Sequence, residues 1–104
     1  MTLQELNNIL KSTGYEVAYS HFNTPIKPPF ITYLISNSEN FIADNKVYKK
    51  IDNIKIELYT SIKDLQAEEK LEKLLDENDI AYETDETWIE SEKLFQKIYE
   101  VRSI

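Results

Sequence analysis

The spacing of the apolar residues alternates along the chain between three or four positions and two positions, which predicts a mixture of helices and strands. A first helix is predicted to begin at Thr2, because Thr2 and Glu5 have the spacing of a capping box and aliphatic residues follow at every third or fourth position. Gly14, the only glycine, lies where the end of this helix would need a left-handed residue. A second helix is predicted over residues 64–78, with Asp64 as its N-cap. Its buried stripe is formed by Ala67, Leu71, Leu74 and Leu75.

Three strands are predicted between these helices. Residues 15–22 and 30–35 are rich in aromatic and β-branched residues, and a stiff loop with three prolines separates them. Residues 46–60 are predicted as one long strand, because aliphatic and polar residues alternate near its end, which places one face on the core and the other in solvent. Residues 36–45 are polar and turn-forming, and are predicted as a connecting loop.

The C-terminal part is predicted to be a closing pair of strands. Residues 80–84 and 87–101 form the pair, with the bend at Asp85 and Glu86. The last segment also fits a helical spacing, an alternative that its aromatic and β-branched content disfavours. The order is therefore α-β-β-β-α-β-β, an α+β fold in a single domain (residues 1–104) with two helices packed on one face of a mainly antiparallel sheet. Large side chains are expected to share one core or lie at its margin: Phe30, Leu58, Leu71, Leu74 and Trp88.

Composition limits the chemistry that the chain can perform. Its 104 residues are 41% hydrophobic and 30% charged, as is usual for one globular domain. Without cysteine it has no disulfide, no thiolate nucleophile and no cysteine-based zinc site. A single glycine excludes P-loops, dinucleotide fingerprints and glycine-flanked nucleophile elbows. No stretch is long and apolar enough to span a bilayer.

Few residues suggest catalysis, and the chain is expected not to be an enzyme. The only histidine, His21, follows Ser20, and neighbours on a strand are expected to point to opposite faces. An oxygen-only site for magnesium, manganese or calcium is the alternative interpretation of four carboxylates on the second predicted helix, Glu68, Glu69, Glu72 and Asp76. Lysines interleave with these acids, as they do on a solvated helix face. We therefore expect no catalytic residue, no cofactor and no metal.

Charge is distributed unevenly. The chain has 12 basic and 19 acidic residues, a net charge of −7, and would repel the phosphate backbone of a nucleic acid. Residues 68–92 contain eleven acids and two bases, so that this segment carries −9 and the rest of the chain +2. Opposite charges on two parts of one surface favour head-to-tail association. The other interpretation is that the charge serves solubility alone.

The chain resembles the small tail-completion proteins (tail terminator or tail-to-head joining proteins) of long-tailed phages and prophages of Gram-positive bacteria. The similar stretches are Val17-Ala18-Tyr19-Ser20-His21-Phe22, Pro28-Pro29-Phe30, Asn40-Phe41-Ile42-Ala43-Asp44-Asn45-Lys46-Val47-Tyr48, Ile56-Glu57-Leu58-Tyr59-Thr60 and Trp88-Ile89-Glu90-Ser91-Glu92. They span most of the chain, and the resemblance lies in their order and spacing. It applies equally to the tail terminator and to neighbouring connector proteins of similar size.

This resemblance implies a fold of two helices on a mixed or antiparallel sheet and a non-catalytic structural role. The subunits would form a six-fold ring that caps the finished tail tube and presents it to the head. The implied partners are further copies of the chain, the tail-tube protein and a head connector protein, with no nucleic acid and no membrane. The implied location is the virion tail, after assembly in the host cytoplasm.

The predicted loop is the expected place of assembly, because it holds two apolar residues among polar ones. We expect it to be mobile in the lone subunit and to become ordered against a neighbouring subunit or the tail tube. The candidate interface comprises Asn40, Phe41, Ile42, Asp44, Lys46, Lys49 and Lys50, together with Glu83, Asp85 and Glu86 of the acidic segment of the next subunit. The alternative function is a cytoplasmic adaptor or inhibitor whose acidic segment mimics a nucleic acid or binds a basic protein.

Overall fold

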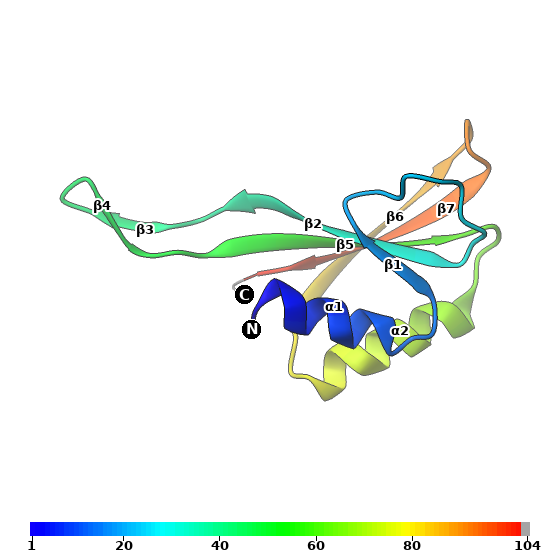
Figure 1. Ribbon diagram of the computed structural model, residues 1–104, viewed down its shortest axis with the longest axis horizontal. Helices are drawn as coiled ribbons and strands as arrows, with labels where there is room; N and C mark the ends of the chain where they lie inside the picture. Colours follow the sequence, from blue (N-terminus) through cyan, green and yellow to red (C-terminus); the bar gives the residue numbers. More distant parts are fainter. Residues whose placement is uncertain (103–104) are drawn as a thin grey trace.

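A computed structural model describes residues 1–102 of the protein, without the side chains of residues 41 and 47–49. In this part of the chain, two helices cover one face of a five-stranded sheet, and a two-stranded hairpin extends from the sheet (Figure 1). The elements in chain order are α1 (Leu3–Lys11), β1 (Glu16–Tyr19), β2 (Phe30–Ser38), β3 (Phe41–Ala43), β4 (Lys46–Lys49), β5 (Asp52–Thr60), α2 (Leu65–Glu77), β6 (Tyr82–Ile89) and β7 (Leu94–Val101). The predicted α+β fold is confirmed, and the hairpin β3–β4 is an addition to the predicted order.

The sheet has the strand order β1-β2-β5-β7-β6. The pair β1–β2 is parallel, whereas β2–β5, β5–β7 and β6–β7 are antiparallel. The prediction of a mainly antiparallel sheet is therefore confirmed. The segment between β1 and β2 crosses the face of the sheet opposite the helices (Figure 1).

Side chains cap the N-termini of both helices at the predicted positions. The hydroxyl oxygen of Thr2 accepts a hydrogen bond from the backbone N–H of Glu5 at 3.1 Å, and the carboxylate of Asp64 accepts one from Ala67 at 3.1 Å. These bonds satisfy amide groups that have no partner within a first helical turn. Gly14 follows α1 with φ +86°, the left-handed conformation that was predicted for it.

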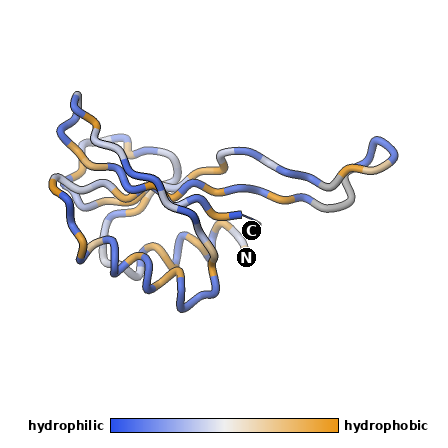
Figure 2. The backbone as a smooth tube through the Cα atoms, turned by 180° about the vertical axis from the view of Figure 1, so that it is seen from behind, coloured by the Kyte–Doolittle hydropathy of each residue, from blue (hydrophilic) through white to orange (hydrophobic). Residues whose placement is uncertain are grey.

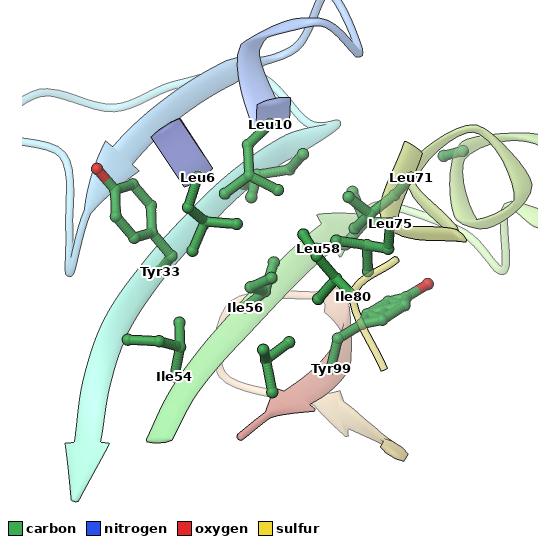
Figure 3. Close-up of a cluster of buried hydrophobic side chains, with 13 residues drawn as sticks. Leu6, Leu10, Tyr33, Ile54, Ile56, Leu58, Leu71, Leu75, Ile80 and Tyr99 are labelled. Atoms are coloured by element: carbon green, nitrogen blue, oxygen red, sulfur yellow. The ribbon is translucent and has the colours of Figure 1, made fainter. Parts of the chain in front are cut away.

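The core lies between the helices and the sheet (Figure 3). It consists of Leu6 and Leu10 of α1, Ala67, Leu71 and Leu75 of α2, Ile31 and Tyr33 of β2, Ile54, Ile56 and Leu58 of β5, Ile80, and Tyr99 and Val101 of β7. Hydrophobic positions on both helices face the sheet, and hydrophilic positions lie on their outer side (Figure 2). The helical spacing of three or four residues and the strand spacing of two therefore place apolar side chains in the same layer, between the helices and the sheet.

The strand predicted over residues 46–60 is two elements. Only β5 (Asp52–Thr60) belongs to the main sheet, and β4 (Lys46–Lys49) pairs with β3 instead. Part of the predicted loop at residues 36–45 is likewise strand, because β2 continues to Ser38 and β3 begins at Phe41. The prediction of a plain connecting loop is wrong, because backbone pairing continues beyond the region that the helices cover.

The bend predicted at Asp85 and Glu86 is also wrong. Strand β6 continues through both residues to Ile89, and the turn lies at residues 90–93, where Lys93 has φ +56°. Consecutive acidic residues are typical of turns, but they are equally compatible with an exposed strand at the edge of a sheet. The alternative of a helix over the last segment is excluded, since β7 is a strand over its whole length.

The predicted core set is only partly confirmed. Leu58 and Leu71 are buried, and Phe30 and Leu74 are half-buried. Trp88 is 41% exposed and does not belong to the core. It pairs with Phe95, which in turn pairs with Thr60, the last residue of β5, so Trp88 lies near the end of the sheet.

Leu71→Ala is expected to lower the free energy of unfolding by about 2–5 kcal/mol, because Leu71 is fully buried and its truncation would leave a cavity. The matched control is Leu65→Ala on the same helix, where the side chain is 62% exposed and the expected loss is about 0.5 kcal/mol or less. Urea denaturation of both variants measures the difference. Equal midpoints for the two variants would contradict the packing of α2 on the sheet.

Candidate assembly interface

The hairpin β3–β4 projects from the body of the molecule as an arm, which we define as residues 39–51 (Figure 1). The molecule measures 49 × 31 × 24 Å, and its radius of gyration is 14.7 Å. A compact domain of about 100 residues has a radius of gyration of roughly 13 Å. The arm accounts for this elongation, because it extends beyond the two layers of the body.

A two-residue turn at Asp44 and Asn45 closes the arm. Both residues have positive φ angles, +52° and +61°, and Ala43 pairs with Lys46 on either side of them. Positive φ at both central positions is characteristic of the type I′ turn, which matches the twist of a hairpin, and Asp and Asn tolerate it better than most residues. The adjacent Asp and Asn were thus a signal for a hairpin that the sequence interpretation missed.

Backbone and side-chain contacts fix the base of the arm. The N–H of Glu39 donates to the carbonyl of Ile51 at 2.8 Å, and the side-chain oxygen of Asn40 accepts from the N–H of Ile51 at 3.1 Å. The Glu39 carboxylate also forms an ion pair with Arg102. Asn40 therefore acts within the arm itself, although it was predicted to be an interface residue.

Beyond the base, the described side chains of the arm include exposed apolar and charged ones. Ile42 is 62% exposed, and Asp44, Lys46 and Lys50 are exposed. The side chains of Phe41 and Lys49, which were also predicted to lie in the interface, are outside the described part of the structure. An isolated two-stranded hairpin is at best marginally stable in water, so the arm is well suited to pack on another surface.

The acidic residues of the candidate interface lie on β6, and they divide between its two faces. Glu86 forms an ion pair with Lys63, whose ammonium group also binds Glu68 at 2.8 Å. The hydrogen bond from Lys63 lowers the pKa of Glu86. Glu83 and Asp85 are exposed and point to the opposite face of the sheet from Glu86, since strand residues alternate. Of these three carboxylates, only Glu86 has an ion pair within the described part of the chain.

The structure does not bring the two halves of the candidate interface together in one molecule. Strand β6 is separated from β2, the strand that leads into the arm, by β7 and β5. The arm and β6 extend from different parts of the body (Figure 1). Only the base of the arm, at Glu39, lies near β6, where it lines one cavity with Glu83, so a contact between the outer part of the arm and β6 would join two molecules.

A buried polar network that the sequence interpretation did not identify lies on the face opposite the helices. The Tyr59 hydroxyl donates to the Glu57 carboxylate at 2.6 Å, and the side-chain N–H of Gln96 donates to the Tyr59 oxygen at 2.9 Å and also to Glu57. Glu57 is only 8% exposed. Burial, with a further contribution from Glu57, raises the pKa of Tyr59 to about 12. The alternation of residues on β5 predicted that the face carrying Glu57 is solvated, and the burial of Glu57 shows that this prediction is wrong.

His21 and Ser20 lie beside this network, at a shallow cavity of about 320 Å³ whose lining includes Phe22 and Tyr59. The imidazole Nδ1 of His21 is 3.2 Å from the Ser20 hydroxyl oxygen. Their expected separation on opposite faces of a strand is wrong, because β1 ends at Tyr19 and Ser20 has φ +68°. Within residues 1–102 no carboxylate hydrogen-bonds to the imidazole, so the pair lacks the orienting group of a catalytic triad.

Among residues 1–102, no three histidine, aspartate or glutamate side chains are grouped closely enough to hold a metal ion. The two helices of this part are both too short and too polar to cross a bilayer. Comparison with models of known protein families gives no match, and comparison with curated proteins gives none either.

Tyr59→Phe is expected to make the free energy of unfolding less dependent on pH above pH 10. A phenol whose pKa is raised in the folded state contributes stability that is fully present below the unfolded pKa of 10.0 and is lost as the pH rises toward 12. Urea denaturation at pH 8, 9, 10 and 11 measures the slope for both proteins. Tyr99, whose pKa burial also raises, retains part of the slope in the variant. Identical slopes would contradict the burial of the Tyr59 hydroxyl.

Proposed function

We propose that the protein is a non-catalytic structural subunit of the phage tail-completion type, which assembles as a ring on the end of the tail tube and helps to join the tail to the head. The arm is the observation that carries this proposal. It presents exposed Ile42 and basic residues at a distance from the body, while exposed acidic residues lie on β6. The resemblance in the sequence stretches supports the same role.

A surface of this kind is suited to repeated association. The arm and the acidic strand are different surfaces, so that a contact between them is head-to-tail and leaves both surfaces available at the ends of each dimer. Such contacts close into a ring when the rotation between neighbours is a simple fraction of a full turn. A six-fold ring on the tail tube, with a head connector protein on its other side, is the assembly that we propose for the virion tail.

The second candidate is an adaptor or inhibitor that binds a basic protein. The observation that favours it is the cluster of exposed acids on the outer side of α2, which includes Glu69, Asp76 and Glu77. An adaptor would bind its basic partner through these residues and would not depend on the arm.

Ile42→Ser is expected to leave the fold intact and to weaken ring formation, because Ile42 is exposed on the arm and removal of its apolar surface affects only a partner contact. The matched control is Ile62→Ser, where a body residue that is 68% exposed undergoes the same change. Light scattering measures the assembly of each purified variant. Rings that form equally well from both variants would show that the arm is only a connector.

Deletion of the gene in an inducible prophage is expected to yield tails and filled heads that do not join. Complementation with the native chain should restore complete virions, and complementation with the Ile42→Ser variant should restore fewer of them. Electron microscopy and plaque counts measure both outcomes. Normal, joined virions from the deletion strain would overturn the proposed function and leave the adaptor as the better candidate.

A further inference from the structure

We propose that the outer edge of β6 is the docking site for strand β4 in the arm of a second copy of this chain, so that the sheet continues from one molecule into the next. This inference rests on the proposed function only in taking the partner to be another copy. It adds the mode of contact, which is backbone pairing along one defined sheet edge, and the pair of strands that meet.

The two edges of the sheet differ in how they end. At the β1 edge the strand has only four residues, and Ser20 with φ +68° terminates it. The Tyr19 hydroxyl then accepts the N–H of Ile35 at 3.1 Å, so a side chain satisfies the backbone group that a longer β1 would have bonded. This edge is closed in the manner by which proteins limit strand addition.

The β6 edge has no such closure. Strand β6 pairs with β7 over eight consecutive residues without a register shift, and it contains no proline. Within residues 1–102 no strand pairs with its outer side. Its six interior positions, residues 83–88, are all exposed. The edge therefore offers a long straight row of backbone donors and acceptors to an incoming strand.

Three charged residues lie in a row across the sheet face opposite the helices, and the row ends at the β6 edge with an excess of negative charge. Lys55 of β5 is opposite Glu100 of β7, and Glu100 is opposite Glu83 of β6. Like charges that face each other across a strand pair are unfavourable. A basic residue on the next strand would neutralise Glu83 and continue the alternation of charge. Arg102 lines the cavity of about 420 Å³ next to this row, but it is already paired with Glu39.

Charge also selects which strand can dock on this edge. A second copy of β6 would bring acidic residues against Glu83 and Asp85, and β3 (Phe41–Ala43) has no charged residue at all. Strand β4 (Lys46–Lys49) begins and ends with lysine and is followed by Lys50. It pairs with β3 on one side, and within the described residues no strand pairs with its other side. It is the strand of this chain whose charge and free edge both complement β6.

Cysteine cross-linking tests the contact directly, because the native chain contains no cysteine. Protein with Lys46→Cys on the arm is mixed with protein that carries Thr84→Cys on β6, and a short bis-maleimide is added. We expect a cross-linked heterodimer from this mixture. Lys46→Cys with Glu16→Cys on the closed β1 edge is the matched control and should give at least about tenfold less product. Equal yields with the two edges, or no product with β6, would overturn the inference.

A charge exchange tests whether the edge or the acidic segment as a whole binds the arm. Glu83→Lys with Asp85→Lys is expected to weaken self-association by about tenfold or more, because the arm would then meet like charge. Mixing this variant with Lys46→Glu, Lys50→Glu protein should restore association. Glu69→Lys with Asp76→Lys on exposed positions of α2 makes the same change in net charge and should have little effect. Circular dichroism verifies that each variant is folded.

The outcomes separate this inference from the proposed function. Rings and complete virions from the Glu83→Lys, Asp85→Lys variant would overturn the β6 contact and leave the structural role intact. Loss of association in the α2 control as well would show a diffuse electrostatic attraction and would also overturn the inference. A strong arm-to-β6 cross-link in a protein whose deletion leaves virions normal would support the inference and overturn the phage role.

Discussion

The pairing of β5 on both sides is the constraint on which the rest of the structure depends. Ile54, Ile56 and Leu58 of this strand are at most 1% exposed, and they face both helices while β2 and β7 enclose them from the sides. Burial of such side chains is worth about 1.5–3 kcal/mol each. They fix the register of β5, because a slip of one residue would turn Lys55 and Glu57 into the core. The helices, the sheet order and the position of the arm all follow from this register.

The arm is a consequence of the same strand pair. Strands β2 and β5 remain paired beyond the region that the helices cover, but a register shift between Ile35 and Asn37 places one extra residue, Ser36, in β2. A bulge of this kind bends the strand and increases its twist. From that point the two strands extend beyond the body with only each other as partners, and the pairing continues into β3 and β4. A single strand pair therefore contributes both to the core and to the candidate interface.

The sequence predicted the features that local patterns control, and it did not predict the features that depend on tertiary contacts. Thr2, Asp64 and Gly14 have the expected roles, because capping and left-handed turns depend on neighbouring residues. The alternation over Ile54–Leu58 identified the face of β5 toward the core, but it also implied that Glu57 is solvated. A proline-containing loop, with the ring of Phe22 in an edge-to-face contact with Phe30, covers that side of the sheet, and no local pattern indicates it.

The remaining errors concern elements that lack a hydrophobic partner. The first half of the arm was interpreted as a loop because residues 36–45 are mostly polar, although the positive φ angles at Asp44 and Asn45 are what a tight hairpin requires. A bend was predicted within strand β6 at Asp85 and Glu86, because consecutive acidic residues are typical of turns as well as of exposed edge strands. Both elements consist of strands that pair on one side only. Because few of their side chains are buried, their sequences show little alternation of apolar and polar residues. The candidate interface was therefore identified by residue type and charge, whereas its geometry could come only from the structure.

A free sheet edge of eight residues is a hazard for any soluble protein, since it can template uncontrolled pairing. The charges of β6 limit this hazard selectively. Glu83 and Asp85 oppose the pairing of two β6 strands, which would produce a closed dimer and leave the arms unused. A basic strand is not opposed, and in the proposed contact it would come from an arm with only four residues in β4. One such contact would be weak. Around a closed ring every subunit makes two of these contacts, and the last subunit gains the second without losing further freedom, so that completion of the ring would be favoured over open chains.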